Sequence, residues 1–260
     1  MNAGPLAIVQ ARMTSSRLPG KVLLDLHGEP MVIQQLKRIE RATSLSDLVV
    51  ATSTDPSDDE LADEVSNRGY QVERGPLDDV LTRFTMVIDT YQPQHIVRIT
   101  ADCPLISPVV IDQVVQTYLE AEVDYCSNTL TPTYPDGLDV EVIRATVLQE
   151  VARRSTDPHE REHVTLGIYR HPEIFNLLNV TDPEGRDHSD LRWTVDSPDD
   201  FEFVSWVYGE LAPTQPDFDY PDVLSVIEGN PELSRTTNHA ARNVALDGLD
   251  TGAMEHGGNP

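Results

Sequence analysis

The sequence predicts an α/β fold with a mostly parallel, doubly wound sheet. Short strand-like segments alternate with amphipathic helical patterns four times before residue 122, and the links between them are short. A cation-rich polar loop directly follows the first apolar run, which is where open sheets of this kind place a ligand site. Right-handed crossovers are expected between the strands and would leave helices on both faces of the sheet.

The first half of the chain contains these four strand–helix pairs. Residues 6–9, 48–51 and 96–99 are mostly apolar runs that suit buried strands, and residues 71–74 are expected to form another short strand. Residues 31–41 and 78–91 carry apolar positions at helical spacing. Another helix places Leu61 and Val65 on one face and stops at Gly69, and Ser107 with Pro108 caps the fourth helix. The alternation predicts one Rossmann-like unit.

The pattern changes after residue 124. Residues 138–142 alternate strictly and predict a half-exposed strand, and residues 177–180 and 191–195 predict two more strands. Helices are expected at residues 144–154, 160–169 and 222–228, and another opens at residues 196–200. We expect a single domain over residues 1–244 and a disordered, Gly-rich tail over residues 245–260.

Charge composition restricts the partners of the protein. The 260 residues contain 19 Lys and Arg against 44 Asp and Glu, a net charge of −25. This surface argues against nucleic acid or an anionic membrane as a partner. Such acidity is consistent with the hypothesis that the host has a high-salt cytoplasm. Equal stability of the protein in low and in molar salt would contradict this hypothesis.

The remaining composition points to the cytoplasm. No stretch approaches 18 apolar residues, and the N-terminus lacks the charged and apolar regions of a signal peptide. Cys103 and Cys126 have neither metal-site nor redox-motif spacing, and we interpret both as structural thiols.

Three cations gather in the loop after the first predicted strand, namely Arg12, Arg17 and Lys21. Guanidinium groups grip phosphate oxygens through paired donors, and a lysine supplies a compact charge. A solvated loop is the alternative, but cations are scarce elsewhere in the chain. The loop is therefore a candidate polyphosphate site.

Two aspartates end predicted strands. Asp102 follows residues 96–99 and Asp196 follows residues 191–195; a helix cap is the alternative role for Asp102. Mg²⁺ prefers one or two carboxylates together with phosphate oxygens and water. Two such aspartates beside a cationic loop suffice for magnesium-dependent chemistry on a nucleoside triphosphate, and topology suggests that they meet.

Two further groups of polar residues have open roles. Asp136, Asp139 and Glu141 are either the solvated face of a strand or ligands for the hydroxyls of a polyol. Residues 159–163 read HEREH, with Glu160 and His163 one helical turn apart. A solvated helix face with internal ion pairs is favoured there over a site.

Several stretches together resemble the cytidylyltransferases of the spore-coat polysaccharide biosynthesis protein F type, which are related to the enzymes that activate sialic acid and ketodeoxyoctonate. They run in order over residues 5–211: ARMTSSRLPGK at 11–21, GEPM at 28–31, VVATS at 49–53, RG at 74–75, DDVLTRF at 78–84, VRITADCPLI at 97–106, YPDGLDVE at 134–141, EREHVT at 160–165 and LRWTVD at 191–196. The relatives' Asp-Glu-Pro is Asp102-Cys103-Pro104 here, which leaves one carboxylate missing.

The resemblance implies the nucleotide-diphospho-sugar transferase fold, with a sugar-side segment at about residues 124–190 and possible homodimers. It implies that a sugar hydroxyl or sugar phosphate attacks the α-phosphate of CTP and expels pyrophosphate, with Mg²⁺ at Asp102 and Asp196. Arg17, Lys21 and Asp102 would be catalytic. The nucleotide-binding residues would be Gln10, Ala11, Arg12, Ser15, Arg17, Lys21, Ser53, Arg74, Gly75 and Asp102. The acceptor, an acidic sugar or sugar phosphate, would meet Tyr134, Asp136, Asp139, Glu141, Glu160 and His163.

Other classes share parts of this pattern. Glycosyltransferases and sugar-1-phosphate nucleotidylyltransferases use the same fold, but the Asp-x-Asp motif typical of the former is missing from its expected place. A nucleotide-binding regulator without catalysis is the alternative from another class, and the pair Asp102 and Asp196 argues against it.

Overall fold

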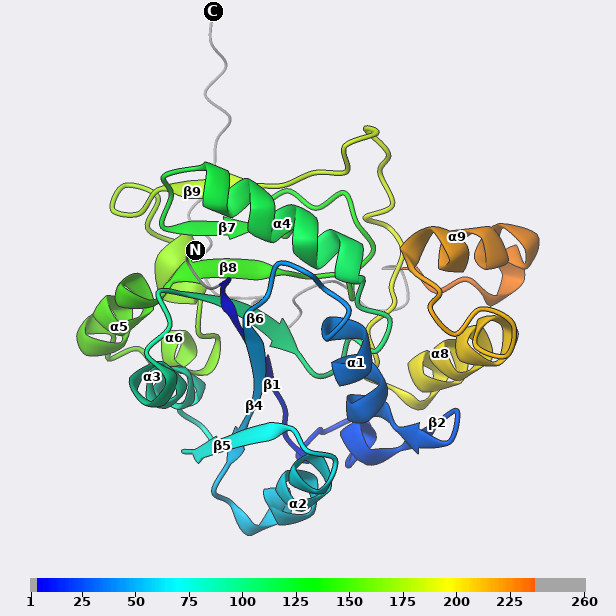
Figure 1. Ribbon diagram of the computed structural model, residues 1–260, viewed down its shortest axis with the longest axis horizontal. Helices are drawn as coiled ribbons and strands as arrows, with labels where there is room; N and C mark the ends of the chain where they lie inside the picture. The colour runs from blue at the N-terminus through cyan, green and yellow to red at the C-terminus, as the bar shows by residue number, and fades with distance from the viewer. Residues whose placement is uncertain (1–3, 237–260) are drawn as a thin grey trace, which may run out of the picture.

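The centre of the computed structural model, which describes residues 4–236, is a seven-stranded sheet in the order β5-β4-β1-β6-β8-β7-β9 (Figure 1). Strands β5, β4, β1 and β6 are parallel, whereas β8 is antiparallel to both of its neighbours. The strands are β1 (Leu6–Gln10), β4 (Asp47–Ser53), β5 (Gln71–Gly75), β6 (His95–Thr100), β7 (Tyr125–Ser127), β8 (Glu141–Arg144) and β9 (Leu177–Asn179). The predicted α/β class is confirmed.

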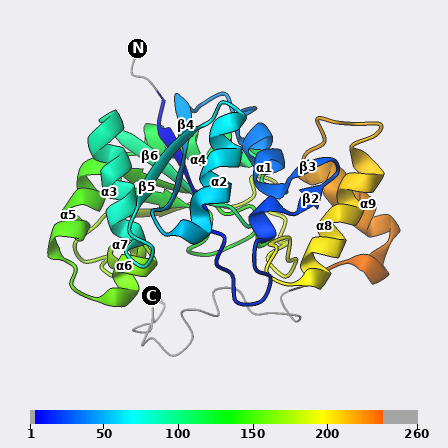
Figure 2. The same cartoon turned by 90° about the horizontal axis from the view of Figure 1, so that it is seen from below.

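Helices cover both faces of the sheet, as Figure 2 shows for α3 and α5 on one side and α1 and α8 on the other. Alternate residues of β1 enter different cores: Ile8 packs with α3 and α5, and Val9 packs with α1 and α4. The helices are α1 (Met31–Ile39), α2 (Asp59–Asn67), α3 (Val80–Tyr91), α4 (Pro108–Glu120), α5 (Ala145–Arg154), α6 (Pro158–Glu162), α7 (Leu166–Tyr169), α8 (Pro198–Leu211) and α9 (Tyr220–Gly229).

The four strand–helix pairs of the first half are confirmed, but three predictions in the second half are wrong. The strand expected at residues 138–142 is β8, two to three residues later, and its alternating Glu141 and Val142 are both buried. The helix expected at residues 160–169 is broken into α6 and α7 at Val164. Residues 191–195 form no strand and make isolated bridges to Asp136 and Thr236.

Two further expectations concern the C-terminal tail and membrane-spanning segments. The tail predicted at residues 245–260 lies outside the described residues. Within residues 4–236, no helix is long and apolar enough to cross a membrane.

The strand order creates a switch point beside β1. The chain moves from β1 to β4 and β5 on one side and later to β6 on the other, so ligands are expected at the carboxyl ends of β1 and β6. Register brings Gln10 beside Thr100, and the Ala101 amide donates to the Gln10 carbonyl at 2.9 Å. The cationic loop and Asp102 therefore start from adjacent strands.

Arg83, in the first turn of α3, is a buried charge. It is 1% exposed, and none of its guanidinium nitrogens has a hydrogen-bond partner among the described residues. We expect Arg83→Met to raise the free energy of unfolding by about 1–3 kcal/mol, because it removes a desolvated charge without breaking a hydrogen bond. Denaturant unfolding measures this.

Arg38 offers the matched control. It is buried as well, but its guanidinium donates to the carbonyls of Ile106 at 2.8 Å and Phe218 at 3.1 Å. Arg38→Met should therefore lower stability, and a similar loss in both variants would contradict the prediction for Arg83.

Candidate active site

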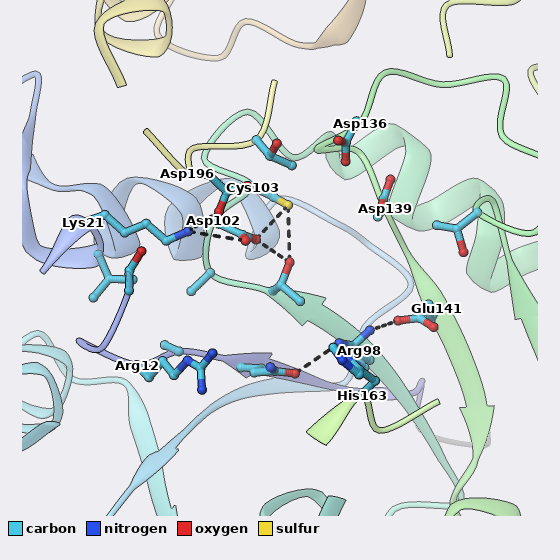
Figure 3. A pocket seen from close by; sticks show the side chains of 18 of the residues that line it. Arg12, Lys21, Arg98, Asp102, Cys103, Asp136, Asp139, Glu141, His163 and Asp196 are labelled. Carbon is cyan, nitrogen blue, oxygen red and sulfur yellow. Dashed lines mark hydrogen bonds and ion pairs between the residues drawn. The ribbon is translucent and has the colours of Figure 1, made fainter. Parts of the chain in front are cut away.

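A pocket of about 500 Å³ opens at the carboxyl ends of β1 and β6 (Figure 3). Most of the residues predicted to form a site line it. These are Gln10, Ala11, Arg12, Ser15, Arg17, Lys21, Asp102, Asp136, Asp139, Glu141, His163 and Asp196. The switch point thus gathers groups from the N-terminal loop, from β6 and from the segment after residue 124.

Two hydrogen bonds of the Met13 backbone hold the cationic loop in place. Buried Asp58 accepts from the Met13 amide at 2.7 Å, and the Met13 carbonyl accepts from the Gly20 amide at 2.9 Å. Gly20 has a φ of +72°, a left-handed conformation that glycine adopts without strain. This turn starts the short 3₁₀ helix at Lys21–Leu23 and directs Lys21 into the pocket.

Lys21 lies between the two predicted strand-end carboxylates (Figure 3). Its Nζ is 2.9 Å from Asp196 Oδ1 and 3.6 Å from Asp102 Oδ2, and it donates to the Val195 carbonyl at 2.6 Å. Burial by itself lowers the pKa of Lys21, but the two carboxylates outweigh it and raise that pKa. The ammonium is therefore charged at neutral pH.

Asp196 carries a negative charge because neighbouring cations favour its ionised form. Burial raises the pKa of Asp196, but the charges of Lys21, Arg17 and Arg192 outweigh burial and lower it. Arg17 Nη2 is 3.0 Å and Arg192 Nη2 is 2.5 Å from Asp196 Oδ2. Three cations converge on this one carboxylate, which holds it at the end of the pocket.

Backbone contacts between two distant segments bring Asp196 to Asp102. The Trp193 amide donates to the Asp136 carbonyl at 2.6 Å, and the Val195 amide donates to the Asp102 carbonyl at 2.8 Å. Gly137 has a φ of +114°, and a Cβ there would lie 2.8 Å from the Trp193 carbonyl carbon. A glycine is therefore required for the turn to lie against the segment that ends in Asp196.

Arg192 and Arg98 line the pocket but were not predicted as site residues. Arg192 is 3% exposed and joins Asp136 Oδ2 at 2.8 Å to Asp196. Arg98 pairs with Glu141 and donates to Gln10 Oε1 at 3.3 Å. The signal that could have found Arg98 is a cation in the middle of an apolar strand, since such a charge is kept only with a partner.

Five predicted site residues do not line the pocket. Arg74 donates to the Ser53 carbonyl at 2.7 Å and to Asp59 at 2.6 Å, and Gly75 leaves room for the Arg83 side chain. The Ser53 hydroxyl is bonded to Asp58. These groups brace the ends of β4 and β5.

The other two residues outside the pocket belong to the predicted acceptor side. Tyr134 is buried, and its hydroxyl donates to Gln113 Oε1 at 2.7 Å. Glu160 packs against Gly167 and lies 4.0 Å from the His171 ring.

Residues 159–163 also match the zinc-binding motif His-Glu-x-x-His, so their sequence does not by itself exclude a metal. The geometry argues against zinc, because the described residues contain no group of three or more His, Cys, Asp or Glu that could hold a metal ion. Of the two histidines, His163 lines the pocket and His159 is exposed.

The chemistry of Asp102 and Asp196 suits a magnesium ion. Each places a carboxylate oxygen next to the Lys21 ammonium, so the two carboxylates lie close together, and both are partly exposed. Hard oxygen donors suit Mg²⁺, which completes its shell with phosphate oxygens and water. The donor set therefore agrees with the predicted ion.

The neighbouring cysteine is not a nucleophile in this arrangement. Cys103 is 2% exposed, and burial raises the pKa of its thiol well above the ordinary value. Cys126 is also buried, and neither cysteine forms a disulfide. A protonated thiol packed beside Asp102 has a structural role.

A cationic loop that faces two carboxylates, Asp102 after β6 and Asp196 just before α8, in a doubly wound sheet, defines the class of nucleotide-handling α/β enzymes. The model of the cytidylyltransferase family matches residues 6–210. The chain is 32% identical to the spore coat polysaccharide biosynthesis protein SpsF of Bacillus subtilis (strain 168), over 88% of this chain and 96% of that protein. The chain therefore belongs to the cytidylyltransferase family.

Two further comparisons agree. A solved structure of a cytidylyltransferase from Leptospira borgpetersenii superposes with a TM-score of 0.82 at 28% identity, over 90% of this chain and 96% of that one. A 116-residue stretch is 37% identical to the 3-deoxy-manno-octulosonate cytidylyltransferase of Geobacter sulfurreducens, which covers 44% of this chain and 45% of that protein. The nucleotidyltransferase fold and the enzyme class of the prediction are confirmed.

Proposed function

We propose that this enzyme transfers CMP from CTP to an acidic sugar or a sugar phosphate, with Mg²⁺ as its metal, for the synthesis of a surface polysaccharide. The proposal rests on one cluster of charged side chains in the pocket. Lys21 contacts both Asp102 and Asp196, and Arg17 contacts Asp196. The name of the Geobacter relative supports an acidic sugar as the acceptor.

The residues of the chain divide the work of nucleotide binding and transfer. Arg12, Arg17 and Lys21 would bind the triphosphate, and Arg17 and Lys21 would stabilise the leaving pyrophosphate. Magnesium held by Asp102 and Asp196 would supply charge neutralisation. Positioning and electrostatics do most of this work, and no covalent intermediate is needed.

The remaining predicted residues stay assigned as proposals. Nucleotide contacts are proposed for Gln10, Ala11, Ser15, Ser53, Arg74 and Gly75. Acceptor contacts are proposed for Tyr134, Asp136, Asp139, Glu141, Glu160 and His163. We also propose that the enzyme works in the cytoplasm, where CTP is made, and as a homodimer, which light scattering would test.

Pyrophosphate release is the test of the proposed function. The protein is assayed with Mg²⁺ and CTP, UTP, ATP or GTP, against nonulosonic acids and sugar phosphates. We expect release with CTP and with one class of acceptor. Tight CTP binding by calorimetry without release for any pair would favour the non-catalytic regulator instead.

A further inference from the structure

His163 is a titratable group of the pocket that the triphosphate chemistry does not use. It follows α6 and lines the pocket on the same side as Arg98 and Glu141 (Figure 3). Among the described residues, its imidazole has no hydrogen-bond or ion-pair partner. A side chain with a free ring nitrogen in a ligand pocket is available to a substrate.

The carboxylates of the pocket are already engaged. Asp102 and Asp196 share Lys21, Asp136 accepts from Arg192, and Glu141 is paired with Arg98. The remaining acid, Asp139, also has an interaction partner. A carboxylate that balances a cation is a weak base, because the ion pair favours its charged form.

The backbone next to His163 is strained. Val164 has a φ of +39°, which is rare for a β-branched residue, and its side chain is fully buried in the core with α3 and α5. The residues on both sides of it, His163 and Thr165, line the pocket. Strain of this kind persists where the surrounding structure holds it, and it concentrates at functional sites.

Burial, helped by nearby cations, lowers the pKa of His163 and favours its neutral form. Burial is the main cause that lowers its pKa, and the cations Arg98 of β6 and Arg12 of the N-terminal loop lower it further. On its own helix, Glu162 acts in the opposite direction and His159 in the same direction. Tyr169 of α7 also lines the pocket, and burial raises the pKa of its hydroxyl to about 12, so it is uncharged.

We propose that His163 is the general base that removes the proton from an acceptor hydroxyl as its oxygen attacks the α-phosphorus of CTP. The new oxygen–phosphorus bond forms while the bond from the α-phosphorus to the bridging oxygen breaks. The proton moves to the free ring nitrogen, and the electron pair leaves with pyrophosphate. The inference rests on the proposed function and restricts the chemical class of the acceptor.

The need to remove a proton from the acceptor restricts which kind of acceptor group is possible. A sugar phosphate is largely ionised at neutral pH, because the second pKa of a phosphate monoester is about 6, so it needs no base to become a nucleophile. A hydroxyl does need one. The acceptor atom is therefore the hydroxyl of a sugar and not the oxygen of a sugar phosphate.

The test compares His163→Gln with the wild type in pyrophosphate release. Loss of a general base should lower kcat about 100- to 10,000-fold and leave the KM for CTP nearly unchanged. In the wild type, kcat/KM should fall as the pH drops through a pKa below that of free histidine, and this limb should vanish in the variant. Added imidazole should restore part of the rate of His163→Ala, in which the smaller side chain leaves space for it.

His159→Gln is the matched control, because His159 is exposed on the same helix and does not line the pocket. It should keep the kcat and the pH profile of the wild type. A His163→Gln variant that does the same, or a wild type that prefers a sugar phosphate, would overturn the inference and leave the cytidylyl transfer intact. A wild type that releases no pyrophosphate with any acceptor would overturn both.

Discussion

Replacing Asp196 with alanine is expected to lower kcat for pyrophosphate release at least about 1,000-fold while the fold stays intact. Asp196 meets Lys21, Arg17 and Arg192, and we propose that it holds magnesium with Asp102. Its removal takes away one of two metal ligands and leaves three cations without their shared partner. Asp102→Ala should have a similar effect.

Steady-state rates over a range of Mg²⁺ concentrations measure this prediction. Asp196→Asn, which keeps the shape and loses the charge, should resemble Asp196→Ala. Asp199→Ala is the control, because Asp199 lies on the next turn with a side chain 74% exposed. Near-normal turnover in Asp196→Ala at any magnesium concentration would show that the metal assignment is wrong.

Lys21→Met should lower kcat/KM for CTP about 100- to 1,000-fold, as expected for the loss of a donor aimed at the charge of a reacting group. It should also lower the free energy of unfolding by about 1–3 kcal/mol, since the Val195 carbonyl loses its donor and two carboxylates lose the cation between them. Both carboxylates remain partly solvated, which limits the loss.

Magnesium offers a readout that separates these effects. With Lys21 removed, Asp102 and Asp196 repel one another, so MgCl₂ should raise the melting temperature of Lys21→Met more than that of the wild type. Lys37→Met is the control, because Lys37 is half-exposed and pairs with Glu29 away from the pocket. Equal effects of magnesium on the wild type and Lys21→Met would contradict a shared metal site.

The fold could be predicted well where local pattern and tertiary context agree. In β1 and β4 the central run is apolar, and β6 is apolar at its centre except for Arg98, because parallel strands are covered on both faces. The helices between these strands keep one apolar side. Ser107 caps α4 as the sequence indicates, and α8 begins within the predicted residues 196–200. These signals are local, and the packing reinforces them.

The prediction failed where polar residues are buried by partners far away in the chain. Glu141 alternates with apolar neighbours as an exposed strand residue would, but it is buried because Arg98 lies beside it on β6. Residues 191–195 are apolar enough for a strand, but they pack against the Asp136 turn through isolated bridges. Neither partner is visible in a local window of sequence.

The sequence by itself determined the class of the fold and the two halves of the site. The cations Arg12, Arg17 and Lys21 follow β1, and Asp102 follows β6, because a loop after a parallel strand must lie at the carboxyl edge of the sheet.

Only the tertiary structure decided how these groups meet. Asp196 reaches Lys21 through the turn at Gly137 and the Arg192 bridge, and His163 enters the pocket through the strained backbone at Val164. Such placements depend on backbone contacts between segments far apart in the chain, which no spacing of residues encodes.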